Sequence, residues 1–469
     1  MPIGLAEVPA PAQRGNPLVL GFRREVDRFR NGNGQIRRHL IRRRLEHLES
    51  ILSYPVRWLL AVLLRILLEA LKPVVQIRFA RLGSCSLGLF ALPTEAYLCE
   101  REAGLHPRNA FDVFYRYDRD AGGIRPPSKR EAMVCNEQLD RMFRPHLRIW
   151  PLAGFLDRLN RMLPRGSESF IVPMPQPNDR FGVLEPFAPH LSFSPDEEVK
   201  GRREMERMGV PAGSPFVCFH ARDGAWAFRV RPRIKELYGD WYPGQERNAS
   251  ITHCLLAAER LTQLGYAAIR MGKHVEGPIE TTNPRIIDYA WNHQSDFMDI
   301  YLSARCVFFL GQNSGMTSVP MAFRKCLAFI NIYPMSEFTY TDHTDSVFIP
   351  KLLHSKKLGR FLTFREVAEW GLDTFFWKYP NLRETGQELG LSVVENSPEE
   401  IWEVASEVHQ RLQGIFAPTG EDEELHRRFI ALVKAYPKAM VHEKGLCKLD
   451  EPHIRMGAAF LRNHRELLD

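Results

Sequence analysis

The sequence predicts an α/β protein made of two Rossmann-like domains with parallel sheets, with helical extensions before and after them. Two observations support this prediction. Short apolar runs of strand length alternate with helical patterns, first within 79–205 and more clearly within 206–365, and such alternation is typical of βαβ units. In the second block, polar and ionisable residues directly follow several apolar runs, as they do where parallel strands end at a ligand site.

The first block, 79–205, alternates between short strand-like and helical segments. Strands are expected at 77–82, 87–92, 111–117 and 170–172, and helices at 135–144 and 155–162. Segment 181–196 is rich in proline and phenylalanine and has no clear period, which predicts a linker to the second block.

The second block, 206–365, has the clearer pattern. Strands are expected at 215–219, 266–271, 285–289, 306–310 and 326–332, and helices at 251–265, 297–304 and 316–323. Gly265 stands where a glycine favours the end of a helix. Region 366–469 is predicted to be a helical extension, with helices at 399–412 and 421–435. Region 1–78 is predicted to be a separate, basic helical segment.

The composition is that of an ordinary globular protein. Of its 469 residues, 44% are hydrophobic and 25% are charged, which suits two or three domains with their own cores. The eight cysteines form no C-x-x-C pair, which argues against a zinc site, and Cys218 and Cys306 stand in apolar runs, as buried reduced thiols of a cytoplasmic protein would. The N-terminus shows no signal-peptide pattern. The formal charge of +7 favours anionic partners.

A basic segment at 23–44 precedes an apolar stretch at 58–68. The stretch is shorter than the roughly 20 apolar residues of a bilayer span, and Arg65 interrupts it. It fits a helix in the membrane interface, with residues 23–72 contacting anionic lipid on the inner face of the cytoplasmic membrane. The alternative is a core-packed helix with a solvated basic face. No DNA- or RNA-binding motif accompanies the basic segment, so nucleic acid is not an expected partner.

The first candidate motif follows the strand expected at 215–219 and contains His220, Arg222 and Asp223. Arg222 has the planar fork that binds a diphosphate through two parallel hydrogen bonds. His220 or Asp223 is suited to move a proton or to orient a sugar hydroxyl. The alternative is an Arg222–Asp223 ion pair beside a histidine whose hydrogen bonds are internal.

The second candidate motif is the segment 311–317, between an expected strand and an expected helix. Free backbone amides at a helix start bind anions, and Ser314 adds a hydroxyl. Gly311 and Gly315 would allow a phosphate to approach the backbone closely. The alternative is an ordinary helix cap formed by Asn313 or Ser314.

Further candidates lie at other strand ends of the same block. Arg270 could pair with phosphate, and Asp288 and Tyr289 stand where a base or ribose would lie. The long basic loop at 224–250 could close over an anionic ligand, or it could be a solvated surface loop. The remaining candidates for donor contacts from these segments are Arg247, Asn248, Gly272 and Asp299.

These motifs resemble, in order and spacing, a family of inferred bacterial glycosyltransferases found with surface-polysaccharide genes. The resemblance covers about 80–370 and is carried by 89–100, 217–223, 247–251, 269–272, 287–289 and 312–315. More distantly, the second block resembles the donor domain of GDP-fucose fucosyltransferases, whose His-x-Arg motif matches His220-Ala-Arg222. The segments 298–304 and 312–314 resemble later motifs of that family. Asp223 departs from it, because the family has a second arginine there.

The resemblance implies a GT-B-like fold, with an acceptor domain at 79–205 and a donor domain at 206–365. It implies that Arg222 contacts the diphosphate of a nucleotide sugar, that Asn313 and Ser314 belong to the same site, and that Asp299 supports the structure or the nucleotide. The expected co-substrate is a GDP- or UDP-linked sugar, from which a hexosyl or deoxyhexosyl group passes to a glycan, a lipid-linked molecule or a protein.

We expect catalysis without a metal ion, because Arg222, the segment 313–315 and Arg270 would stabilise the leaving diphosphate. The catalytic base stays open between Asp223 and His220 in the second block and Glu95 and Glu100 in the first.

Two alternative functions follow from other features. Asp118 and Asp120 form a D-x-D sequence, which in GT-A transferases holds a metal ion and a diphosphate, although it also fits a surface turn. The basic helical start and the helical end would suit a non-catalytic scaffold of polysaccharide assembly. Hydrolase signatures are missing, since the sequence has no G-x-S-x-G and no H-E-x-x-H.

Overall fold

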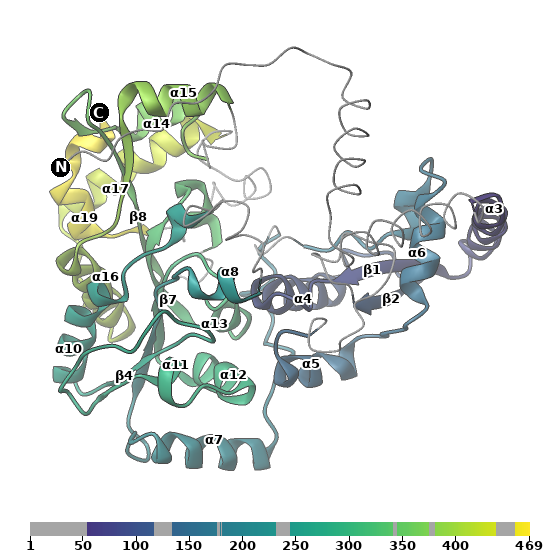
Figure 1. Ribbon diagram of the computed structural model, residues 1–469, viewed down its shortest axis with the longest axis horizontal. Helices are drawn as coiled ribbons and strands as arrows, with labels where there is room; N and C mark the ends of the chain where they lie inside the picture. Colours follow the sequence, from purple (N-terminus) through teal and green to yellow (C-terminus); the bar gives the residue numbers. More distant parts are fainter. Residues whose placement is uncertain are drawn as a thin grey trace, which may run out of the picture. The chain divides into compact units, whose positions relative to one another are not determined.

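The computed structural model describes residues 54–116, 134–175, 179, 181–230, 244–340, 345–374, 380–437 and 455–469 (Figure 1). The chain forms two compact units. Of the described residues, one unit contains those from Tyr54 to Pro73 together with Arg158–Glu168, and the other contains those within Val74–Asp157 and Ser169–Asp469. The basic segment 23–44, the Asp118–Asp120 pair and residues 231–243 of the basic loop at 224–250 lie outside the described residues.

The smaller unit is built around helix α3 (Tyr54–Leu71), which confirms the expected helix. Arg65 ties α3 to the 158–168 segment by donating to the Arg165 carbonyl (2.6 Å), to Asn160 Oδ1 (2.8 Å) and to the Leu163 carbonyl (3.0 Å). Ala61 and Leu68, on the same side of α3 as Arg65, are buried, whereas large apolar side chains on the opposite side of the helix are exposed. No helix among the described residues is long and apolar enough to cross a membrane.

The first α/β block of the larger unit has a small parallel sheet. Strand β1 (Gln76–Leu82) pairs in parallel with β2 (Ala110–Arg116), and parallel bridges to Ile171 and Ile149 extend the sheet on its two sides. Helices α5 (Glu137–Phe143) and α6 (Ala153–Arg161) lie where helices are expected.

The strand expected at 87–92 is wrong, because these residues begin helix α4 (Leu87–Glu102). Every residue from Phe90 to Glu100 is buried. The helix packs against helix α13 (Ser318–Ala322) of the second block, and the Phe90 ring lies 5.4 Å from the Phe143 ring. A helix that is buried all round carries no polar face, so its apolar run cannot be told from a buried strand by periodicity.

The second block is a seven-stranded sheet in the order β12-β8-β7-β6-β3-β4-β5, and all its neighbouring strands are parallel. The strands are β3 (Phe216–Phe219), β4 (Ala267–Arg270), β5 (Ile286–Ile287), β6 (Phe308–Gly311), β7 (Cys326–Ile332), β8 (Val347–Pro350) and β12 (Arg455–Met456). From β5 to β8 the order is that of a dinucleotide-binding Rossmann sheet. The order reverses between β3 and β6, so this pair forms the topological switch point. The predicted α/β fold with parallel sheets is confirmed.

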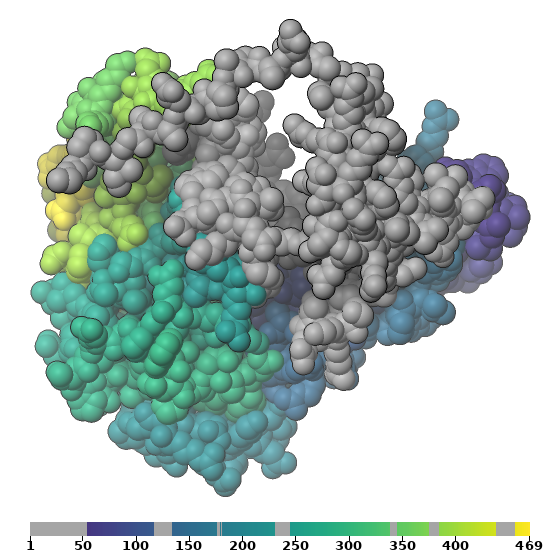
Figure 2. Space-filling model, viewed as in Figure 1, coloured from purple at the N-terminus to yellow at the C-terminus, as the bar shows by residue number. Residues whose placement is uncertain are grey.

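Helices cover both faces of the larger sheet (Figure 1). Helices α10 (Leu255–Gln263) and α16 (Pro398–Leu412) pack together on one face, and α12 (Asp296–Arg305) and α13 lie on the other. All seven residues of β7 are buried, as expected for a strand covered on both faces. Gly265 follows the end of α10 with a φ of +96°, which confirms its predicted place. In Figure 2, the teal and green residues of this block that grey atoms do not cover pack against one another.

The last part of the chain completes this block. Helix α17 (Gly420–Ala435) lies where a helix is expected, and the Phe429 ring packs 5.9 Å from the Phe348 ring of β8. An antiparallel sheet that the sequence pattern did not predict joins β10 (Arg360–Phe361), β9 (Leu352–Ser355) and β11 (Leu391–Val394). The remaining helices and 3-10 turns are η2 (Arg144–His146), η3 (Ser167–Phe170), α7 (Pro195–Arg207), α8 (Ala225–Val230), η4 (Gln245–Arg247), η5 (Ile251–Cys254), α11 (Tyr289–Asn292), η6 (Met335–Tyr340), α14 (Phe364–Glu369), α15 (Pro380–Leu389), α19 (Ala458–Asn463) and η9 (Arg465–Leu468).

Candidate functional site

The candidate site lies at the carboxyl ends of the strands of the seven-stranded sheet. His220 and Arg222 follow β3, Gln312 to Ser314 follow β6, and Lys351 follows β8. Because these strands are parallel, their carboxyl ends meet at one edge, and β3 and β6 flank the switch point where such sheets bind ligands.

Arg222 binds the segment 244–248 rather than its neighbour Asp223. Its Nη1 donates to the Gly244 carbonyl (3.0 Å) and to Asn248 Oδ1. Asp223 accepts backbone N–H groups from Ala225 (3.0 Å) and Glu276 (2.9 Å). Among the described residues no Arg222–Asp223 ion pair is found. Both oxygens of Asp223 therefore hold the turn after β3, while the guanidinium of Arg222 is directed at oxygen atoms of another segment.

His220 is a buried, neutral hydrogen-bonding group. Its Nδ1 lies 3.0 Å from the Met271 carbonyl, which can only accept, so Nδ1 carries the proton and Nε2 is left as the acceptor. The pKa of His220 is lowered to about 4, mainly by burial; the hydrogen bond to Met271 opposes this, and the charges of Arg270 and Arg222 contribute to the lowering. Such a ring stays neutral at pH 7. It is therefore better suited to orient a hydroxyl or N–H group than to take up a proton.

The segment after β6 presents hydrogen-bond acceptors. Asn313 Nδ2 donates to the Tyr333 carbonyl (2.9 Å) and to Glu337 Oε2, both pure acceptors, which fixes the orientation of the amide. Gln312 Nε2 is fixed in the same way by the Arg247 carbonyl. Gln312 Oε1, Asn313 Oδ1 and Ser314 Oγ are buried and have no hydrogen-bond partner within the part of the chain that the structure describes. The two amide oxygens can accept from a ligand's N–H or O–H groups but cannot bind a phosphate oxygen.

The helix after 313–315 starts later than expected, and the predicted anion site at 313–315 stays a prediction. Helix α13 begins only at Ser318 and has five residues. The Ser314 backbone N–H already donates to Thr317 Oγ1 (3.2 Å). A Cβ atom on Gly315 would lie 3.0 Å from the Gly88 backbone nitrogen, so Gly315 allows the start of α4 to approach this segment.

Four of the other residues predicted to contact the donor form two pairs, Arg270 with Asp288 and Tyr289 with Asp299. Arg270 is buried and donates to both carboxylate oxygens of Asp288 (3.3 and 3.2 Å). Tyr289 donates to Asp299 Oδ1 (2.8 Å), and burial raises the pKa of Asp299 to about 7. Gly272 has a φ of +158°, and a Cβ there would lie 2.8 Å from Val275. The prediction that these residues contact the donor stays a prediction.

The sequence pattern missed Lys351, whose side chain is only 3% exposed. Its Nζ donates to the Asn248 carbonyl, so Lys351 and Arg222 both bind Asn248. A lysine that directly follows the apolar run 347–350 was the only available signal, and that run was not identified as a strand.

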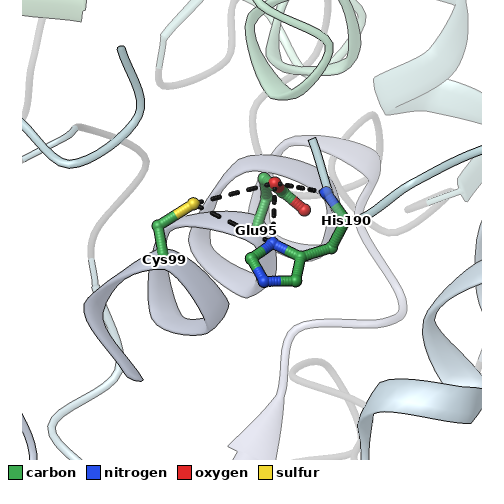
Figure 3. A group of neighbouring side chains, drawn as sticks. All are labelled: Glu95, Cys99 and His190. Carbon is green, nitrogen blue, oxygen red and sulfur yellow. Dashed lines mark hydrogen bonds and ion pairs between the residues drawn. The ribbon is translucent and has the colours of Figure 1, made fainter. Parts of the chain in front are cut away.

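A second cluster, Glu95, Cys99 and His190, has the residue types of a metal site (Figure 3). Glu95 Oε1 lies 3.1 Å from His190 Nδ1 and 3.8 Å from Cys99 Sγ. However, Arg324 Nη2 also contacts Glu95 Oε1 (3.0 Å) and Cys99 Sγ (3.1 Å). A guanidinium thus already supplies the positive charge that a metal ion would bring.

Arg324 also fixes the linker between the two blocks. Its Nε donates to the carbonyls of Leu184 (2.7 Å) and Phe187 (3.2 Å), and Glu95 accepts the His190 backbone N–H (3.0 Å). The cluster therefore clamps the linker between α4 and the end of α13. Glu95, one of the two bases considered in the first block, is part of this clamp.

Comparisons with known proteins give low similarity. No protein-family model and no curated protein matches the chain. Among solved structures, it is similar to E. coli ADP-heptose LPS heptosyltransferase II (14% identity, TM-score 0.33, 59% of this chain and 91% of that chain). It is similar to a glycosyl transferase family 9 structure from Veillonella parvula (10%, TM-score 0.37, 71% and 98%). It is also similar to the dodecameric iron-containing heptosyltransferase TibC in complex with ADP-D-β-D-heptose (11%, TM-score 0.29, 72% and 77%). Values this low assign no activity to this chain.

Proposed function

We propose that this protein is a glycosyltransferase that binds a nucleotide-diphosphate sugar at the carboxyl edge of its seven-stranded sheet. The observation that carries the proposal is the pair of segments at the switch point. Arg222, after β3, supplies a cation, and the segment after β6 supplies three buried oxygens that have no hydrogen-bond partner among the described residues. A ligand with an anionic centre and several hydroxyl or N–H groups matches both, and a nucleotide sugar has this chemistry.

The geometry suggests how the ligand's parts are divided. Arg222 would bind the diphosphate. Arg247 and Asn248 would lie beside the diphosphate, since Asn248 contacts Arg222 through its side-chain oxygen. Gln312, Asn313 and the neutral ring of His220 would accept hydrogen bonds from the base, ribose or sugar, and Ser314 could donate or accept. The pairs Arg270–Asp288 and Tyr289–Asp299 would hold the surrounding loops. This division changes the expectation that Asn313 contacts the diphosphate.

The transfer reaction itself is proposed to need no metal ion, because fixed cations would stabilise the leaving diphosphate. The sugar would be a hexosyl or deoxyhexosyl group linked to GDP or UDP, and the acceptor a glycan, a lipid-linked molecule or a protein. If a chelator abolished transfer and only manganese restored it, a metal-dependent reaction using Asp118 and Asp120 would replace this proposal.

Thermal unfolding with a nucleotide panel tests the proposal. UDP, GDP, ADP, CMP and their sugar conjugates, ADP-heptose included, would be added to wild type, to Arg222→Ala and to Arg207→Ala, an exposed arginine as control. A ligand at a hundred times its dissociation constant adds about 2.7 kcal/mol of stability. We expect one diphosphate to stabilise wild type and Arg207→Ala by several degrees, but not Arg222→Ala. A folded wild type that no nucleotide stabilises would favour the scaffold function.

We also propose that α3 rests on an anionic membrane surface. Val56, Leu59, Leu63 and Ile66 are each more than half exposed and lie on one side of the helix. The basic segment 23–44 precedes them in the sequence, and interfacial helices combine such an apolar face with basic residues.

Vesicle sedimentation tests this surface. The double substitution Leu63→Asp and Ile66→Asp should reduce binding to vesicles containing phosphatidylglycerol by roughly tenfold or more, because each leucine-sized side chain contributes about 1.5 kcal/mol or more when buried. Val74→Asp, an exposed position outside α3, is the control. Equal binding of all three proteins would exclude α3 as the contact.

A further inference from the structure

Three large apolar side chains lie on the surface of the first block, at the start of α6. Trp150 is 49% exposed, Leu152 72% and Phe155 39%. The Ala153 backbone N–H donates to the Trp150 carbonyl (3.1 Å) and the Phe155 N–H to the Leu152 carbonyl (3.0 Å), so the three residues belong to one tight turn. We call these three residues the Trp150 patch. Exposed apolar side chains that gather in one place mark a contact surface more often than single ones do.

The turn that presents the patch is held from its other side. Tyr115 of β2 donates to Asp157 Oδ2 (2.6 Å), and a Cβ atom on Gly154 would lie 2.9 Å from the Tyr115 ring. This side of α6 therefore rests on β2. Helical positions two residues apart point about 200° away from each other, so Leu152 and Phe155 face away from the sheet. Their exposure follows from how the helix is seated.

An arginine that pairs with no carboxylate stands beside the patch. Arg148 is exposed, and its guanidinium lies 4.7 Å from the centre of the Phe111 ring. The same ring lies 6.1 Å from the Trp150 ring. Within the described part of the chain, Arg148 forms no ion pair. A guanidinium stacked on a ring keeps its N–H groups in solvent, where they can bind an anion.

Exposed negative charge is missing from the same segments. In the described segments 105–116 and 144–157 the carboxylates are those of Asp112 and Asp157, and both are buried. Each accepts a hydrogen bond from a tyrosine. A surface that binds sugar rings needs well-placed polar groups beside its aromatic rings to bind the hydroxyls. Apolar side chains next to an arginine, without exposed carboxylates, match the surface of an anionic lipid layer better.

We propose that the Trp150 patch and Arg148 bind the surface of an anionic membrane. The Trp150 ring would lie among the lipid headgroups, Leu152 and Phe155 would enter the outer part of the acyl region, and Arg148 would pair with lipid phosphate. This contact belongs to the first block and uses neither α3 nor the residues after β3 and β6. The opposing interpretation is a surface for a protein or a glycan.

Three substituted proteins test the contact. The double substitution Leu152→Asp and Phe155→Asp removes the apolar part, and Arg148→Gln removes the charge. Ile415→Asp is the matched control, because Ile415 is an apolar residue of the second block that is 65% exposed. Circular dichroism would establish that each protein is folded. Sedimentation would compare vesicles of phosphatidylglycerol mixed with phosphatidylcholine and vesicles of phosphatidylcholine alone.

We expect the double substitution to weaken binding to the phosphatidylglycerol vesicles by about tenfold or more, because two large apolar side chains no longer leave water. Arg148→Gln should weaken it by about fivefold at low ionic strength, the effect of one arginine near an anionic lipid surface, and by much less in 1 M salt. Ile415→Asp should bind as wild type does. Equal binding of all four proteins would overturn the proposal.

Tryptophan fluorescence gives a readout that α3 does not share. The chain has eight tryptophans, so the part that belongs to Trp150 is the difference between wild type and Trp150→Phe. Vesicles with brominated acyl chains quench tryptophans that reach the lipid, and we expect them to quench wild type more strongly than Trp150→Phe. Equal quenching would overturn the proposal. A dimer of wild type that forms without vesicles and is lost in the double variant would also overturn it, in favour of a protein contact. Neither measurement uses a nucleotide, so its outcome is independent of the proposed transfer reaction.

Discussion

Two groups of buried charges in the larger unit differ in how completely they are paired. In the first block, Arg78 donates to both oxygens of Asp112 (2.7 and 2.8 Å) and contacts His106 Nδ1 (3.1 Å). Tyr97 adds a hydrogen bond to Asp112 (2.6 Å), and His106 Nε2 reaches Glu100 (3.1 Å). At the edge of the seven-stranded sheet, by contrast, Arg222 and Lys351 meet on one neutral residue, Asn248.

The difference is consistent with the proposal that the first group of charges is structural and that the second binds a ligand. Although burial opposes ionisation, the bonds from Arg78 and Tyr97 hold the pKa of Asp112 below its ordinary value, so this carboxylate is ionised and fully partnered. Glu100, the other base considered in the first block, belongs to this closed network. Among the described residues, Lys351 at the sheet edge has no such carboxylate at hydrogen-bonding distance, since Glu395 Oε1 lies 3.9 Å from its Nζ.

Breaking the paired network should have the largest effect on stability. Asp112→Ala leaves Arg78 buried without its counter-ion, and removing one partner of a buried pair costs about 3–5 kcal/mol. Denaturant unfolding would measure this loss, and nucleotide affinity of the folded fraction should stay unchanged. Glu388→Ala, at an exposed ion pair, should produce no measurable change. A small loss of unfolding free energy in Asp112→Ala would mean that complete pairing of a buried charge does not indicate a structural role.

Arg270→Gln tests the boundary between the two groups, because this pair is buried and paired yet lies at the sheet edge. If a buried charge that is fully paired has a structural role, the free energy of unfolding falls by about 2–4 kcal/mol in this variant. The dissociation constant of the stabilising nucleotide then changes little. Arg285→Gln, an exposed arginine of the same block, is the control. A stable Arg270→Gln protein that no longer binds nucleotide would instead assign Arg270 to the ligand site, as the sequence predicts.

The smallest effect is expected at the linker clamp. The hydrogen bond to Glu95 raises the pKa of His190 against the opposing effect of burial; Glu102 adds to the rise and Arg324 reduces it. A histidine whose pKa is higher in the folded state than in the unfolded state stabilises the fold. This stabilisation is fully present below the unfolded pKa of about 6.5 and is lost as the pH rises through the folded pKa.

Wild type should therefore lose no more than about 1 kcal/mol between pH 6 and pH 9 through this group, since solvent partly screens the ring. Urea unfolding across this range would show the loss, and His190→Asn should remove it. An unchanged pH slope in His190→Asn would exclude His190 as its source.

The sequence predicted those parts of the fold that local patterns encode. Most strands, the helix α10 with Gly265, and the polar residues after β3 and β6 lie where the patterns placed them. Helix α4 was misassigned because tertiary packing buries it on all sides. Lys351 and the orientation of Asn313 were out of reach because their partners, Asn248 and Tyr333, come from distant segments. The local periodicity of a sequence carries no information on contacts between such distant segments.

Strand β12 has a consequence for how the protein can be made or divided. It pairs with β8, although about a hundred residues separate Val347 from Arg455. During synthesis on the ribosome, β8 therefore remains an open edge until Arg455 and Met456 have emerged, and open edges pair readily with other chains. A fragment ending at the sequence-based boundary of 365 would keep that edge permanently and would be prone to aggregate. The strand that Lys351 directly follows would then be the one left without its outer neighbour.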